Sequence, residues 1–147
     1  MIKKRLAKLS AMAIAAVVLA TSAVPASAAN TENSSWTFGT PGVYTFTPAR
    51  KKTNTSSVYV KVNSGQPGAY IKTYGGKEES DGITTWLNWT QYVDHVTANP
   101  GVASSIHNLI YENGCRHAKL YGRAVSPTKT TTIVWSPDST RNYTFLN

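Results

Sequence analysis

The 147-residue sequence contains a single cysteine, Cys115, and therefore cannot form an internal disulfide. Small extracellular domains commonly use several disulfides to compensate for a limited core. This chain must instead rely on packing, or on a bridge through Cys115 between two copies. We expect a half-buried free thiol and leave a dimer through Cys115 as the alternative.

The sequence also lacks the short motifs that specify catalysis or metal binding. It contains no G-x-S-x-G, H-E-x-x-H or C-x-x-C segment and no phosphate-binding glycine loop. Cys115 and His117 would project side by side on one strand, but no residue is placed to orient the histidine as a base. His95, His107 and His117 match no metal-ligand spacing. We predict that the protein is not an enzyme and has no catalytic residue, metal site or cofactor.

Acidic residues are scarce, with 7 Asp and Glu against 15 Lys and Arg. Glu78, Glu79 and Asp81 crowd into one predicted loop, which indicates a solvated tip rather than the separated carboxylates of a glycosidase. Four basic residues lie within the first eight positions, so the rest of the chain carries 11 basic and 7 acidic residues, a net charge of +4. This mild excess predicts no nucleic-acid partner, and it is compatible with anionic cell-wall polymers or phospholipid headgroups.

The only long apolar run is AMAIAAVVLA, at residues 11–20. It follows a basic start and precedes Pro25 and three small residues, which is the layout of a secretory signal. A bilayer span takes roughly 20 apolar residues, and this run is too short unless polar neighbours are counted. We expect cleavage between Ala28 and Ala29, a secreted product, and no stable membrane span after cleavage.

Aromatic and β-branched residues dominate the remainder, whereas Leu and Glu are few. None of the aromatic residues lies before residue 29. This composition favours strands. We predict an all-β fold, a small antiparallel β-sandwich or barrel of about six to eight short strands. The predicted organisation is a signal peptide at 1–28, a flexible leader at 29–35 and a single β domain at 36–147.

Alternating polarity and turn residues place the strands. The predicted strands are residues 36–38, 43–47, 57–62, 69–74, 83–93, 116–125 and 130–135, with an edge strand at 142–146. The first two should form a hairpin, and residues 57–62 and 69–74 should form a second antiparallel hairpin. Residues 83–93 and 106–112 also fit helical spacing, and residues 75–82 read as an exposed loop.

The strand at residues 116–125 alternates between small or apolar residues that face inward and larger residues that face outward. The outward set is His117, Lys119, Tyr121 and Arg123.

The second predicted hairpin defines a candidate ligand-binding surface. Its members are Tyr59, Lys61, Tyr70, Lys72 and Tyr74, which share one face if the two strands pair. Aromatic rings stack on sugar rings or apolar groups, and lysines contact anionic substituents. The alternative is that a second sheet covers this face and the tyrosines belong to the core.

The sequence contains VYVK at residues 58–61, IHN and YENGCRHAKL within 106–120, and VWSPDS at 134–139. In these segments it resembles a group of small exported proteins of Gram-positive bacteria to which no function is assigned. The resemblance implies export and a compact domain, and it supplies no active site. More loosely, the size and all-β character are similar to secreted β-sandwich bacteriocins of the lactococcin-972 type, without matching motif residues.

These observations favour a secreted, non-enzymatic interaction module that binds cell-envelope glycans or anionic surface polymers through the tyrosine–lysine surface. Two alternatives stay open. One is a bacteriocin-like antimicrobial or membrane-active factor, and the other is an inhibitor of extracellular enzymes that presents the loop at residues 75–82.

Overall fold

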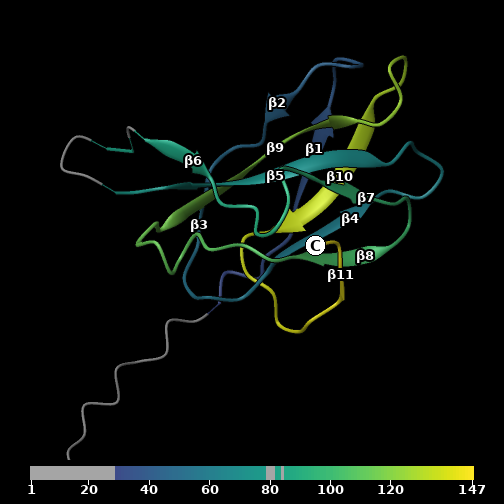
Figure 1. The fold of residues 1–147 in the computed structure, drawn as a ribbon. Coiled ribbons are helices and arrows are strands. Elements are labelled where there is room, and N and C mark those ends of the chain that lie inside the picture. Colours follow the sequence, from purple (N-terminus) through teal and green to yellow (C-terminus); the bar gives the residue numbers. More distant parts are fainter. Residues whose placement is uncertain (1–28, 79–81, 84) are drawn as a thin grey trace, which may run out of the picture.

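Two β-sheets pack face to face in the computed structural model, which describes residues 29–78, 82, 83 and 85–147 (Figure 1). No helix occurs within these residues, and the sheets do not close into a barrel. The predicted fold class, a small all-β sandwich, is confirmed. The predicted signal peptide at residues 1–28 lies outside the described residues.

The first sheet, sheet A, has five strands in the order β1-β10-β4-β8-β11. Their bounds are Ser34–Phe38 (β1), Thr131–Ser136 (β10), Val58–Val62 (β4), Ala103–Ile106 (β8) and Thr144–Phe145 (β11). The pairs are antiparallel except for β11, which runs parallel to β8. As predicted, the last strand of the chain lies at an edge of a sheet.

The second sheet, sheet B, is built on the long antiparallel pair of β5 and β9. Its strands are Ala69–Gly76 (β5), His117–Ala124 (β9), Thr45–Phe46 (β2), Arg50–Lys51 (β3), Trp86–Asn88 (β6) and Val96–Ala98 (β7). The short strands β2 and β3 pair with β9, and β6 and β7 pair with β5. Because β5 and β9 pair over eight residues, they fix the position of everything else in this sheet.

Both predicted hairpins are wrong. β1 pairs with β10 in sheet A, whereas β2 pairs with β9 in sheet B. Likewise β4 belongs to sheet A and β5 to sheet B. Each predicted turn therefore carries the chain from one sheet to the other. Turn residues reveal a change of direction, but they do not say whether the next strand pairs beside the last one or crosses over, as it does in many sandwiches.

Two predicted segment boundaries also change. The strand predicted at 83–93 is confined to β6, and it is followed by bends at residues 91–94. Gly75 and Gly76 end β5 and are buried, so they do not belong to the predicted loop at 75–82. Residues 79–81 of that loop lie outside the described residues.

The inward-facing residues of both sheets form the core. In β4 and β9 every second residue is fully buried or nearly so, as their alternation predicts. Phe38 of β1 reaches across the core to β9, where a Cβ on Gly122 would lie only 2.7 Å from the Phe38 ring. The same Cβ would lie 2.7 Å from the backbone oxygen of Tyr70 on β5. Only glycine permits this close approach of β1 to sheet B.

Replacing Gly122 with alanine should therefore lower the free energy of unfolding by about 1–3 kcal/mol, because the added methyl group overpacks the core. Urea unfolding followed by tryptophan fluorescence measures the change. Gly39→Ala is the matched control, since a Cβ at that position meets no atom within 4 Å. Equal loss of stability in the two variants would contradict the packing of Phe38 on Gly122.

Candidate functional site

The outer surface of sheet B carries a continuous group of aromatic and basic side chains, which we call the aromatic–basic face. Its members are Tyr44, Phe46, Tyr70, Lys72, Tyr74, Trp86, Lys119, Tyr121 and Arg123. They come from β2, β5, β6 and β9, except for Tyr44, which immediately precedes β2. They face outward because the residues between them on β5 and β9 are buried in the core.

The antiparallel register of β5 and β9 mixes the two kinds of side chain. Tyr70 lies opposite Arg123, and Tyr74 lies opposite Lys119. Between these pairs, Lys72 lies opposite Tyr121. Directly opposed residues have Cβ atoms about 5 Å apart, so each basic side chain has an aromatic neighbour. Aromatic and basic side chains alternate along the outer face of each strand. Because of the register, they also alternate across the pair, and the surface is mixed in both directions.

Tyr121 is the centre of the aromatic contacts. Its ring stacks on Tyr44 with centroids 5.0 Å apart and lies 4.4 Å from Phe46. The ring of Tyr74 meets Tyr121 edge-on at 5.7 Å and meets Phe46 edge-on at 5.2 Å. Stacked and edge-on arrangements of this kind are favourable beyond the area they bury. The rings therefore support one another and form an ordered surface.

Two of the basic residues lie over aromatic rings. Lys119 Nζ is 3.9 Å from the centre of the Phe46 ring and 4.0 Å from that of Trp86. The Arg123 guanidinium is 4.8 Å from Tyr70 and 5.2 Å from Tyr44. Neither cation has a carboxylate within 4 Å in the part of the chain that the structure describes. Burial lowers the pKa of Lys119, and its contact with the rings is of the cation–π type.

The third basic residue, Lys72, has a carboxylate partner. Its Nζ lies 2.7 Å from Asp94, and this hydrogen bond raises the pKa of Lys72 and lowers that of Asp94. The Asp94 side chain is 69% exposed, so the pair contributes little to stability. The face as a whole holds three cations and this one carboxylate, and it therefore favours an anionic or neutral partner.

The structure divides the five predicted ligand-binding residues between two surfaces. Tyr70, Lys72 and Tyr74 lie together on the aromatic–basic face, and they are half-buried rather than covered by a second sheet. Tyr59 and Lys61 lie on the outer face of sheet A, on the opposite side of the sandwich. The five-residue surface is therefore wrong as a single unit, because β4 and β5 do not pair.

The prediction missed the contribution of β9 to the site. Lys119, Tyr121 and Arg123 were expected to face outward, and they do. The missing information was that β9 pairs with β5, from which it is separated by about 40 residues. The only signal in the sequence was that both segments alternate aromatic and basic residues on one face.

A second group of polar residues surrounds a buried ion pair. Lys52 and Asp138 are both fully buried, with Nζ 3.0 Å from Oδ1. Lys52 Nζ also donates to the carbonyl oxygens of Ser56 at 2.6 Å and Pro137 at 2.8 Å. The ammonium thus has three acceptors for its three protons. Burial lowers the pKa of Lys52 even though the Asp138 charge raises it.

The second carboxylate oxygen of Asp138, Oδ2, accepts three more hydrogen bonds. Oδ2 accepts from the backbone N–H of Asn30 at 2.8 Å, the backbone N–H of Thr53 at 3.0 Å and the Thr53 hydroxyl at 2.6 Å. Burial alone would raise the pKa of Asp138, but the Thr53 hydroxyl, the Lys52 charge and the Asn30 N–H outweigh it and hold that pKa below its usual range.

Asn30 lies within the segment predicted as a flexible leader, and it is held on several sides. Its amide nitrogen donates to the carbonyl oxygen of Lys51 at 2.7 Å, and its amide oxygen accepts from Arg50 at 3.3 Å. β1 then begins at Ser34. These contacts fasten the amino-terminal segment to sheet B through β3 and to sheet A through Asp138.

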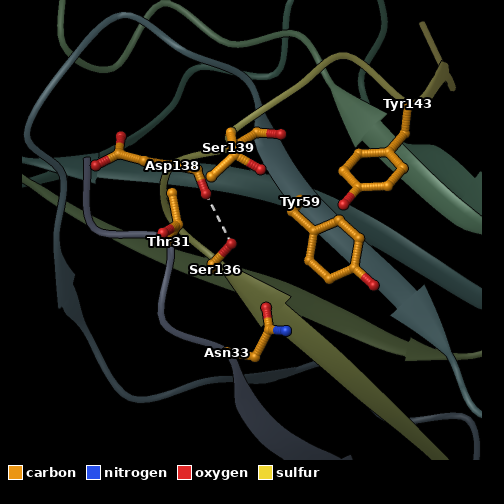
Figure 2. Close-up of a pocket in the computed structure, with 8 residues that line it drawn as sticks. Thr31, Asn33, Tyr59, Ser136, Asp138, Ser139 and Tyr143 are labelled. Atoms are coloured by element: carbon orange, nitrogen blue, oxygen red, sulfur yellow. Dashed lines mark hydrogen bonds between the residues drawn. The ribbon is translucent and has the colours of Figure 1, made fainter.

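A small polar pocket of about 160 Å³ lies beside this ion pair (Figure 2). It is lined by Thr31, Asn33, Tyr59, Ser136, Asp138, Ser139, Thr140 and Tyr143. The rings of Tyr59 and Tyr143 lie next to each other on one side, with centroids 4.9 Å apart. The predicted ligand-binding residue Tyr59 therefore belongs to this pocket and not to the aromatic–basic face.

Cys115 is buried rather than half-buried, with 2% of its surface exposed, and packs with Ile110 and Ala118. Its sulfur is therefore not available from this position for a disulfide to a second copy. Over the described ranges, no group of three His, Cys, Asp or Glu residues could hold a metal ion. The same part of the chain has no helix that is long and apolar enough to cross a bilayer.

The fold and its surfaces define a small β-sandwich protein whose most distinctive feature is an aromatic and basic sheet face. Residues 24–139 match a family described as a protein of unknown function (DUF2712), and the chain belongs to this family. No curated protein and no solved structure matches the chain significantly. The match confirms that the chain belongs to a family without an assigned function, and the function must be argued from the surfaces themselves.

Replacing Lys52 with methionine should lower the free energy of unfolding by about 3–5 kcal/mol, because it leaves the Asp138 carboxylate buried without its cation. Urea unfolding at neutral pH measures the loss. Lys61→Met is the matched control, since Lys61 lies half-buried on the outer face of β4. A Lys52 variant that is no less stable than the Lys61 variant would contradict the structural role of the pair.

Asp138 also makes stability depend on pH. Because its pKa in the folded protein lies below the ordinary value of 3.8, the unfolded chain takes up the proton first as the pH falls. The stability contributed by Asp138 is therefore present above about pH 4 and is lost progressively below it. Unfolding free energies measured between neutral and acidic pH should fall less steeply in Asp138→Asn than in the unmodified protein. Equal slopes would show that other carboxylates cause the acid dependence.

Proposed function

We propose that the protein is a secreted, non-enzymatic interaction module whose aromatic–basic face binds cell-envelope glycans or anionic surface polymers. The observation that carries this proposal is the placement of Lys119 and Arg123, each over two aromatic rings and without a carboxylate partner in the described part of the chain. Rings offer stacking surfaces to sugars, while the two cations can contact phosphate or carboxylate groups.

The shape of the face supports a polymeric partner. Its rings come from β2, β5, β6 and β9, and they are spread over the outer surface of a sheet. Binding sites for small molecules are usually concave and enclose most of the ligand. A surface with several rings side by side instead offers repeated contacts to an extended chain, each of which can be weak.

Export supports a partner outside the cytoplasm, and it rests on the sequence of residues 1–28 alone. The net charge of +4 beyond residue 28 favours encounter with anionic envelope polymers. Charge alone would make the interaction sensitive to salt. Contacts between the aromatic rings and the partner persist when charges are screened. Binding that survives high salt therefore distinguishes the proposed interaction from attraction by charge alone.

Co-sedimentation with washed Gram-positive cell walls tests the proposal. The Debye length falls from about 10 Å at 0.1 M salt to about 3 Å at 1 M, so high salt should weaken binding without abolishing it. Replacing Tyr70 and Tyr74 together with alanine should weaken binding at high salt by about tenfold or more, since two ring contacts of about 1 kcal/mol each are lost.

Tyr111→Ala is the matched control, because it removes another tyrosine that lies under a cation, Arg116, with the guanidinium 4.0 Å from the ring. Tyr111 is not part of the aromatic–basic face, and its variant should sediment like the unmodified protein. Unchanged binding of the double variant, with its fold intact by circular dichroism, would refute the proposed face. Leakage from anionic lipid vesicles without wall binding would favour the membrane-active alternative.

A further inference from the structure

We propose that the polar pocket beside Asp138 is a second binding site, and that it holds a single neutral sugar residue. The pocket lies at the outer side of sheet A, where Tyr59 of β4 and Ser136 of β10 contribute to it (Figure 2). The pocket is separate from the aromatic–basic face on sheet B. The inference about the pocket therefore does not depend on the function proposed for that face.

The size of the pocket limits the ligand to one small ring. Its volume of about 160 Å³ is roughly half of the ~300 Å³ at which pockets for drug-sized molecules begin. An oligosaccharide cannot be enclosed there. A single ring, either free or at the end of a longer glycan, fits this limit.

The lining favours a ligand with many hydroxyl groups. Within the described part of the chain, the half-buried side chains of Thr31, Tyr59 and Tyr143 and the exposed side chain of Asn33 make no hydrogen bond to another protein group. A hydroxyl group can both donate and accept, and an amide offers both functions on separate atoms. Sugar hydroxyls also do both, so they can use these groups in either direction. The pocket thus presents unused polar groups from the amino-terminal segment on one side and from the two tyrosines on another.

Two other hydroxyls of the lining already donate hydrogen bonds to the backbone. Ser136 Oγ donates to the backbone oxygen of Asp138 at 2.7 Å, and Ser139 Oγ donates to the backbone oxygen of Arg141. These bonds fix the chain between β10 and β11, which carries Ser139, Thr140 and Tyr143. The pocket is therefore built on constrained backbone.

The residues that line the pocket carry no unpaired charge, which favours a neutral ligand. Asp138 is the only acidic residue of the lining, and its carboxylate is taken up by Lys52, Thr53 and Asn30. No basic side chain lines the pocket, but the Arg141 guanidinium lies close by, 4.7 Å from the centre of the Tyr143 ring. Burial raises the pKa of Tyr59 and the neighbouring Tyr143 adds to the effect, while Arg141 opposes it, so the Tyr59 hydroxyl remains a neutral donor.

The two tyrosine rings supply the apolar part of the site. They are tilted by 47° with centroids 4.9 Å apart, and together they form one side of the pocket (Figure 2). The C–H face of a sugar ring is apolar and packs on aromatic faces of this kind. Hydroxyl groups on one side and rings on the other thus match the two kinds of surface that a sugar presents.

Nuclear magnetic resonance titration of residues 29–147, which hold every described strand, tests the inference. The probes are N-acetylglucosamine, glucose and inorganic phosphate. At least one sugar should cause saturable shifts in the amides of Tyr59, Ser139 and Tyr143, with a dissociation constant on the order of 1 mM, as expected for a few hydrogen bonds and one ring contact. Phosphate should leave these amides unchanged.

Variants of the lining separate direct contact from general effects. Asn33→Ala and Tyr143→Phe each remove one polar group and should weaken binding about 3- to 10-fold. Tyr111→Phe removes a tyrosine hydroxyl that belongs neither to the pocket nor to the aromatic–basic face, and it should leave this affinity unchanged. The unfolding midpoints of all three variants serve as a check on the fold.

Three outcomes would overturn the inference. Absence of saturable shifts with either sugar would show that no sugar site exists. Equal shifts with phosphate would show that the pocket selects an anion. Sugar shifts confined to β5 and β9 would assign sugar binding to the aromatic–basic face, and would support the proposed function while refuting the pocket. The wall-binding experiment with the Tyr70 and Tyr74 variants tests the aromatic–basic face only, and its result does not bear on sugar binding in the pocket.

Discussion

The burial of Lys52 beside Asp138 is the constraint on which the arrangement of the chain depends. A buried charge is tolerated only when it is paired and hydrogen-bonded, and here the partners come from segments far apart in the sequence: Asn30, residues 52–56 and residues 137–138. These contacts fasten the amino-terminal segment and the connector after β3 to the end of β10. In a chain with one cysteine, this polar cluster ties distant segments together in the way that a disulfide does in other small domains.

The two candidate binding surfaces differ in how the fold produces them. The aromatic–basic face follows from the register of β5 and β9, which places Tyr70 opposite Arg123 and Tyr74 opposite Lys119. The polar pocket depends on the buried pair, because Thr31 lies next to Asn30, which Asp138 holds in place. The first surface is thus open, as the proposed polymeric ligand requires, and the second is small, as the proposed single sugar ring requires.

The sequence was sufficient to predict the fold class and the faces of individual strands, because alternation in segments such as β4 and β9 depends only on which side meets the core. It was not sufficient to predict which strands pair. Pairing depends on contacts between residues dozens of positions apart, and the turn before β5 looks the same whether the chain forms a hairpin or crosses over. The buried pair was equally hidden, since Lys52 lies in a polar stretch and Asp138 in a turn. Their burial is a property of the assembled sandwich.

We propose that the outer face of sheet B recognises an envelope polymer. The most direct measurement is a map of amide shifts when soluble fragments of Gram-positive cell wall are added to residues 29–147 at high salt. The largest shifts should fall on β5 and β9, around Tyr70, Tyr74 and Tyr121. Shifts confined to sheet A, or none at any fragment concentration, would contradict it.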